Sequence, residues 1–156
     1  MGRMYSAEFS KVAVTLDQDF FEIVPADEKP VAIHAIFLSQ SSDVGDAAEE
    51  ILNFKIMRGF TSSGSNGSSS TPAPLNPLDT AAGAGVEVNN TTIATTGTII
   101  DLHSGAFNIR TGLQLIFPPE LRPVATNANT SLVVRLLENP ADSLTMSGTI
   151  YFEEIT

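Results

Sequence analysis

The sequence contains no cysteine and no tryptophan among its 156 residues, and it has only two histidines. Without cysteine, the chain can form neither a disulfide framework nor a thiolate metal site. Two histidines alone supply at most a thin transition-metal site, because such sites usually combine several imidazole or thiolate ligands. We therefore expect the fold to be held by packing, hydrogen bonds and association with other chains.

Basic residues are also scarce. Eight Lys and Arg stand against 18 Asp and Glu, which gives a formal net charge of −10. Proteins bind nucleic acid and anionic membrane surfaces by placing Lys and Arg against them. The basic residues here form no run, so the sequence predicts no direct nucleic-acid binding and no membrane binding.

Long apolar segments are missing as well. No stretch approaches the ~18 apolar residues that a spanning helix needs, and no apolar segment typical of a secretory signal follows Arg3. We therefore expect a protein that is made in a cytoplasm and left soluble. Charged residues make up only 17% of the chain, which favours a surface that is partly covered by other protein.

What the sequence does contain is short runs rich in Val, Ile, Phe, Leu and Thr, separated by turn-forming residues. About eight to ten such runs recur at roughly 10-residue spacing, a pattern typical of a β-sandwich or barrel. The prediction is an all-β fold, a single antiparallel β-sandwich domain of jelly-roll type spanning residues 1–156. An immunoglobulin-like sandwich is the second choice.

Local patterns give further expectations within this fold. The apolar residues change parity between Phe9 and Val12, which predicts a β-bulge near Ser10–Lys11. Val31–Leu38 is apolar at nearly every position, so both faces should be covered, either inside the fold or at a subunit contact. His103–Gly105 is expected to form a turn between two strands.

Two segments are expected to extend from the sandwich. Residues 61–78 combine a Ser/Gly tract with a Pro-rich stretch, which predicts a flexible loop that runs into a stiff extended segment. We expect a neighbouring subunit to hold this loop; the alternative is that it lies on its own domain. Residues 1–5 are expected to form an N-terminal arm that reaches a neighbour.

Candidates for catalysis are few. Nucleophilic catalysis needs a nucleophile beside a base, and the only imidazoles are His34, inside an apolar run, and His103. Asp101 precedes His103 by two residues and would share its face in an extended strand. No Gly-x-Ser-x-Gly elbow accompanies them. The sequence therefore predicts no enzyme and no catalytic residues.

Acidic residues gather at three places without matching a known metal-binding loop. They are Asp17 with Asp19; Asp43, Asp46, Glu49 and Glu50; and Glu153 with Glu154. The first two sets are interpreted as solvated acidic loops with calcium as the alternative, and Ala47–Glu50 could form one helical turn. The third set is interpreted as strand-end charge that discourages edge pairing. No metal site and no cofactor are predicted.

The segments 39–50 and 139–151 give the chain a resemblance to small virion proteins of tailed bacteriophages, of the capsid decoration or cement type. The resemblance implies a β-sandwich on the capsid exterior, a homotrimer, and the major capsid protein as the partner. It carries no catalytic residues. The acidity of the chain suits the outside of a particle rather than a surface in contact with DNA.

Two other functions compete with this one. A receptor- or carbohydrate-binding sandwich of the fibre-tip type predicts exposed aromatic side chains at loop ends, for which Tyr5, Phe60 and Tyr151 are the candidates. A hydrolase would need Asp101, His103 and a hydroxyl group to converge. A stable trimer would favour the structural role over both.

Overall fold

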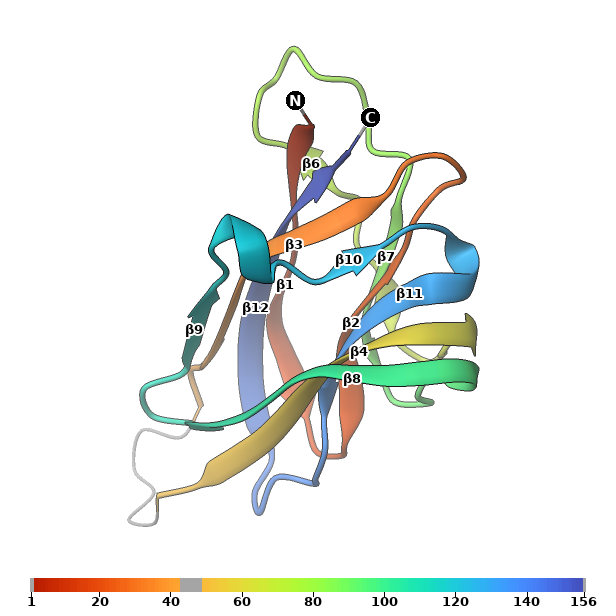
Figure 1. Ribbon diagram of the computed structural model, residues 1–156. Helices are drawn as coiled ribbons and strands as arrows, with labels where there is room; N and C mark the ends of the chain where they lie inside the picture. Colours follow the sequence, from red (N-terminus) through yellow and green to blue (C-terminus); the bar gives the residue numbers. More distant parts are fainter. Residues whose placement is uncertain (1, 43–48, 156) are drawn as a thin grey trace.

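The computed structural model describes residues 2–42 and 49–155, and they fold into two antiparallel sheets packed against each other (Figure 1). The predicted β-sandwich is therefore confirmed. The first sheet contains β1 (Arg3–Val14), β3 (Val31–Gln40), β6 (Ala73–Pro74), β9 (Leu113–Ile116), β10 (Val124–Ala125) and β12 (Leu144–Glu154). The second contains β2 (Gln18–Val24), β4 (Ile51–Ser62), β5 (Ser68–Ser69), β7 (Gly85–Asn90), β8 (Thr95–Asn108) and β11 (Ser131–Leu136). Two 3₁₀ helices, η1 (Pro119–Leu121) and η2 (Ala128–Thr130), lie in the connections.

The strand order is that of a jelly roll. The first sheet runs β10-β3-β12-β1-β6 with β9 also paired to β3, and the second runs β5-β7-β2-β11-β4-β8. Eight of the strands are the main ones: β1, β2, β3, β4, β8, β9, β11 and β12. If these are numbered 1 to 8 along the chain, the first sheet reads 1-8-3-6 and the second reads 2-7-4-5. Successive strands thus alternate between the sheets except for the fourth and fifth, which are neighbours in the second sheet, as in a double-sheet jelly roll. The short strands β5 and β6 and the strand β7 are additions between the fourth and fifth main strands.

The core lies between the two sheets and follows the alternation of the strands. Along β12, buried and half-buried residues alternate without interruption from Leu144 to Glu154, because successive side chains of a strand point to opposite faces. The predicted bulge is confirmed: the pairing of β1 with β12 shifts register between Phe9 and Val12, and Lys11 has a φ of 55°.

The apolar strand β3 is covered by its own chain. Six of the eight residues in Val31–Leu38 are buried, and the exceptions, His34 and Phe37, are half-buried. Phe37 packs edge-on against Tyr151, with ring centroids 5.8 Å apart. The residues of β3 are apolar on both faces because β3 is a central strand of the sheet, and no neighbouring subunit is required to explain this pattern.

The Ser/Gly tract lies on its own domain. This corrects the expectation that a neighbouring subunit holds it. Within residues 61–78, β5 pairs with β7 and β6 pairs with β1. Ser65 and Thr92 exchange backbone hydrogen bonds of 2.9 and 3.1 Å. Polar side chains suit this course, because the tract runs over the surface and still satisfies its backbone groups.

The N-terminal arm is also corrected. β1 begins at Arg3 and pairs with β12 from its first residue. Tyr5 is fully buried, stacks on Phe152 and donates a 2.9 Å hydrogen bond to the carbonyl of Thr80. Apart from Met1, which lies outside the described residues, and Gly2, the expected arm is part of the sheet.

The turn expected at His103–Gly105 is likewise wrong, because β8 runs through these residues without a break. Gly105 lies against the ring of Phe54, where an added Cβ would come within 3.0 Å of a ring carbon. A glycine that makes room for an aromatic ring inside a strand leaves the same sequence signal as a turn glycine.

Candidate functional site

The residues proposed for hydrolase chemistry point to separate partners. Asp101 accepts a 2.6 Å hydrogen bond from Lys55 Nζ, whereas the ring of His103 packs against Phe54 and Phe117. His34 Nε2 lies 2.9 Å from Glu153 Oε2. Asp101 therefore does not orient the imidazole of His103.

The acidic candidates for calcium do not converge in the part of the chain that the structure describes. Asp43, Asp46 and half of the expected helical turn at Ala47–Glu50, namely Ala47 and Ala48, lie outside it. Asp17 is exposed, whereas Asp19 is buried against Arg135. Across residues 2–42 and 49–155, no group of three or more His, Asp or Glu side chains is placed to hold a metal ion.

The aromatic candidates do not form an exposed platform for a sugar. Tyr5 and Phe60 are buried, and Tyr151 is half-buried. The guanidinium carbon of Arg135 lies over the ring of Phe60, 4.9 Å from the centroid of that ring. A carbohydrate site built on these three side chains is therefore excluded.

The acidic pair near the end of β12 is engaged inside the molecule, which corrects its interpretation as strand-end charge. Glu153 accepts hydrogen bonds from His34 and from the backbone N–H of Gly2. The hydrogen bond from His34 is the main reason why the pKa of Glu153 lies below its ordinary value. Glu154 is buried and accepts from the backbone N–H groups of Gly83 and Ala84 at 2.8 and 3.0 Å.

A second acidic group lies on the outer face of the second sheet. Glu22 and Glu87 are directly opposite each other on β2 and β7. Glu22 Oε2 accepts from Ser63 Oγ, the backbone N–H of Gly64 and Asn90 Nδ2, while Glu87 shares Asn90 Nδ2 at 2.6 Å. Burial raises the pKa of Glu22, and the neighbouring carboxylate of Glu87 raises it further.

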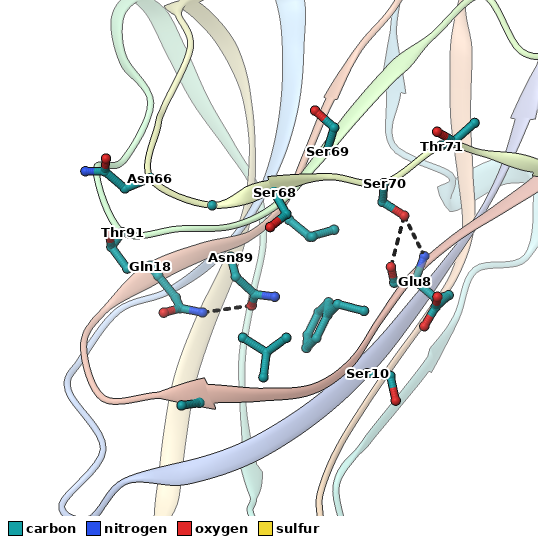
Figure 2. A pocket seen from close by; sticks show the side chains of 15 residues that line it. Glu8, Ser10, Gln18, Asn66, Ser68, Ser69, Ser70, Thr71, Asn89 and Thr91 are labelled. Carbon is teal, nitrogen blue, oxygen red and sulfur yellow. Dashed lines mark hydrogen bonds between the residues drawn. The ribbon is translucent and has the colours of Figure 1, made fainter.

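A cleft of about 550 Å³ opens between β1, residues 66–71 and β7 (Figure 2). Volumes of roughly 300–1,000 Å³ are usual for small-molecule sites. Hydroxyl and amide side chains line its walls, and its floor is apolar. The lining residues include Gln18, Ser68, Thr71, Asn89 and Thr91, with Phe9, Val12 and Val88 on the apolar side.

Asn89 is the most constrained polar side chain of this cleft. It is only 7% exposed and has a φ of 57°, a conformation that Asn tolerates better than most residues. Its Oδ1 accepts a 2.8 Å hydrogen bond from Gln18 Nε2. Its Nδ2 is buried and has no hydrogen-bond partner among the described residues.

Ser70 closes one end of the cleft. Its Oγ donates to the carbonyl of Glu8 at 2.9 Å and accepts from the backbone N–H of Glu8 at 3.2 Å (Figure 2). A single side chain thus occupies both backbone groups by which β1 could pair with another strand at this residue. At Glu8, the cleft therefore offers no free backbone groups to an added strand.

An apolar surface lies at the opposite edge of the sandwich, where β8 and β9 end their sheets. We define it by three exposed side chains: Ile100, Ile116 and Leu121, which are 46%, 68% and 66% exposed. Ile116 and Leu121 line a groove of about 550 Å³, and Ile100 lines the adjoining hollow. Arg58 and Val124 line both, so the surface is continuous.

β8 adds unpaired backbone groups to this surface. It is 14 residues long and, among the described strands, pairs only with β4. Exposed edge strands are usually protected by Lys, Pro or a covering segment. β8 has no Lys and no Pro, and its one charged side chain, Asp101, is bound to Lys55.

Sequence reasoning missed both the cleft and the apolar surface, because each is assembled from segments that are distant in the sequence. The Asn89-Asn90 pair offers a sequence signal for part of the cleft, since Asn is enriched in the left-handed conformation. Across the described residues, no helix is long and apolar enough to span a membrane.

Comparisons with known proteins add little. No protein-family model and no curated protein matches the chain. Among solved structures, it aligns with a T13 particle of infectious bursal disease virus at 16% identity and a TM-score of 0.17, covering 98% of this chain and 39% of that one.

Two structures of T=1 particles derived from the same virus align at 9% and 13% identity. They cover 99% of this chain and 38% of theirs, with TM-scores of 0.14 and 0.15. The chain thus spans less than two fifths of those capsid chains. Such low TM-scores support neither a shared fold nor a shared function.

Proposed function

We propose that this chain is a non-enzymatic structural protein of a virus particle, of the capsid decoration or cement type. It binds its own copies as a homotrimer and binds the major capsid protein on the capsid exterior, bridging and stabilising neighbouring subunits. The observation that carries the proposal is the apolar surface beside the unpaired edge of β8.

This surface combines the two properties of an association site. Ile116 and Leu121 each leave about two thirds of their side-chain surface in water, and burying such area stabilises a complex by roughly 25 cal/mol per Å². Among the described strands, only β4 pairs with β8, so backbone groups on the outer edge of β8 are available to a strand of another chain. In a cyclic trimer, this surface meets a different surface of the next copy.

Fold analogy points the same way without deciding the function. Jelly rolls are common in viral capsid proteins and in lectins, and a fold alone does not specify activity. The resemblance in segments 39–50 and 139–151 is the reason for proposing a tailed bacteriophage as the source of the particle. The proposal therefore rests on the apolar surface, with the fold as background.

The test is native mass by light scattering at two protein concentrations, with the substitution Ile116→Glu. We expect a trimer for the parent chain and a monomer for the variant, because a charge in the contact must be desolvated. Leu78→Glu is the matched control, since Leu78 is 90% exposed and lies outside the apolar surface. It should remain trimeric.

Binding to the capsid is tested separately by cosedimentation with empty capsids. The parent chain should sediment with them and Ile116→Glu should lose most of that binding. A parent chain that is monomeric at both concentrations and stays in the supernatant would overturn the proposal.

A further inference from the structure

The apolar surface beside β8 contains a cation that has no carboxylate partner among the described residues. At least five of the eight Lys and Arg side chains lie within 4.0 Å of an Asp or Glu oxygen, and Arg58 is not one of them. Its half-buried side chain makes one hydrogen bond in the described part of the chain, from Nη1 to the carbonyl of Val124 at 2.9 Å. A cation in such surroundings is costly unless an opposite charge is brought to it.

The remaining donors of Arg58 are open to a partner. Among the described residues, the side-chain nitrogens that are buried without a hydrogen bond belong to Asn89 and Arg122. Nε and Nη2 of Arg58 are therefore unpaired and reached by solvent. The same two nitrogens of Arg135 bind both carboxylate oxygens of Asp19, at 2.6 and 3.2 Å. Arg58 thus offers the edge of a guanidinium that suits a carboxylate.

Apolar side chains surround this cation. Arg58 lines both hollows of the apolar surface, and its bond to Val124 holds it across the gap between β4 and β10. Ile116 and Leu121 line one hollow and Ile100 lines the other. A matching partner therefore presents a carboxylate with an apolar side chain beside it.

The charge of this surface is opposite to that of the protein. The charged residues that line the two hollows are Arg58, Arg122 and Glu120, whereas the whole chain has a net charge of −10. Copies of the chain repel one another over most of their surface, so a contact between them is favoured where a cation of one meets a carboxylate of the next. With 18 Asp and Glu residues, each copy can supply that carboxylate.

We propose that Arg58 binds an Asp or Glu side chain of a second copy of this chain. An apolar side chain beside that carboxylate fills the groove lined by Ile116 and Leu121. Each contact of the homotrimer then joins the apolar surface of one copy to an acidic segment of the next, as a head-to-tail ring requires. This inference rests on the proposed function, because it names the chemistry of the segment that covers the apolar surface.

The test is sedimentation equilibrium of the full chain over a range of concentrations. Arg58→Met removes the charge and leaves the carboxylate of the next copy unpaired, so it should weaken each contact about 30-fold or more. Arg58→Lys keeps the charge without the planar edge and should give an intermediate loss. Lys11→Met is the matched control, because it removes an exposed cation that lines neither hollow. It should assemble as the parent does.

A second variant leaves Arg58 and its bond to Val124 in place. Thr98 is exposed and lines one of the two hollows with Arg58. Thr98→Glu supplies a carboxylate from within the chain, which should compete with the second copy and dissociate the trimer. Thr15→Glu adds the same charge at an exposed position outside both hollows and should not. Circular dichroism melting checks that each variant is folded.

Charge reversal identifies the acidic partner. Arg58→Glu should be monomeric, because two carboxylates would meet in the contact. In that background, each Asp and Glu except the buried Asp19, Glu22 and Glu154 is changed to Arg in turn. One of these changes should restore the trimer by forming the same ion pair with its signs exchanged.

The outcomes separate this inference from the proposed function. A trimer that Ile116→Glu dissociates, but that Arg58→Met and Thr98→Glu leave as tight as the parent, overturns the inference and leaves the proposed function standing. Failure of every reversal to restore Arg58→Glu also overturns it. A monomeric parent overturns the second copy as the partner. If that monomer still sediments with empty capsids, and Arg58→Met abolishes this binding, the carboxylate belongs to the capsid protein.

Discussion

The two acidic groups of this molecule are bound by different kinds of partner. The first group is Glu153 with Glu154, and the second is Glu22 with Glu87 and the neighbouring Asp19. On the first sheet, Glu153 and Glu154 lie near the cations of Arg122 and Lys29, at 4.0 and 3.8 Å, and near the imidazole of His34, at 2.9 Å. On the second sheet, Asp19, Glu22 and Glu87 have one cation, Arg135, which binds Asp19. Neutral donors bind the other two carboxylates.

The difference teaches that the net charge of −10 is not simply a surface charge. Five of the 18 acidic side chains belong to these two groups, and Asp19, Glu22 and Glu154 are buried. In the first group the ionised form of Glu153 is stabilised, and the second group contains a carboxyl group, that of Glu22, which burial drives toward the protonated form. Acidity by itself is therefore a weaker argument for a particle exterior than the sequence suggests.

The largest effect is expected from removing the single cation of the second group. Arg135 Nε and Nη2 bind both carboxylate oxygens of Asp19, at 2.6 and 3.2 Å. Arg135→Met leaves Asp19 as an uncompensated buried charge, so we expect a loss of about 3–5 kcal/mol in the free energy of unfolding. Denaturant unfolding measures it.

Lys55→Met is the control for this prediction. It breaks the more exposed pair with Asp101, where solvent screening limits the loss to about 1 kcal/mol or less. Equal losses in the two variants would show that the buried charge of Asp19 does not depend on its cation.

An intermediate effect is expected at Glu22. Because its pKa is raised, the folded protein binds this proton more tightly than the unfolded chain does. The free energy of unfolding therefore falls as the pH rises from 4.5, the ordinary value, through the raised pKa. Glu22→Gln preserves an oxygen for the three donors and should remove this fall, stabilising the protein near neutral pH by about 1 kcal/mol.

Unfolding curves across a pH series measure the Glu22 effect. Glu87→Gln should give a smaller change of the same sign, because the Glu87 charge contributes to the raised pKa of Glu22. A parent chain whose stability rises over this pH range, with Glu22→Gln unchanged, would contradict the interpretation.

The smallest effect is expected at the half-buried pair of the first sheet. His34→Gln should cost roughly 0.5–1 kcal/mol at neutral pH, the value of one hydrogen bond. The lowered pKa of Glu153 adds stability above pH 4.5, and this stability is lost as the pH falls through that pKa. Urea unfolding of parent and variant should therefore converge in acid; a constant difference would rule out Glu153 as the cause.

Local pattern predicted much of the fold. The short apolar runs predicted the strands of a sandwich, and the parity change near Ser10–Lys11 predicted the bulge of β1. These features depend on neighbours in sequence, so periodicity reveals them. The jelly-roll type followed from the number and spacing of such runs.

The sites were not predictable in the same way. The cleft joins Gln18, Ser68 and Asn89, which are far apart in the chain and meet only because β5 and β7 extend the second sheet. Whether Gly105 forms a turn or makes room for Phe54 depends on a contact with β4 that no local pattern encodes. Long-range strand pairing decides both, and the sequence does not display it.

The pairing of β1 with β12 sets Arg3 opposite Glu154, so both ends of the chain lie at one pole of the sandwich (Figure 1). A short linker could join them, and new ends could be opened in the turn at residues 139–142, where β12 begins at the other pole. Exposed turns of this kind tolerate circular permutation. A fused peptide could then be displayed at either pole of the same scaffold, according to where the chain is cut.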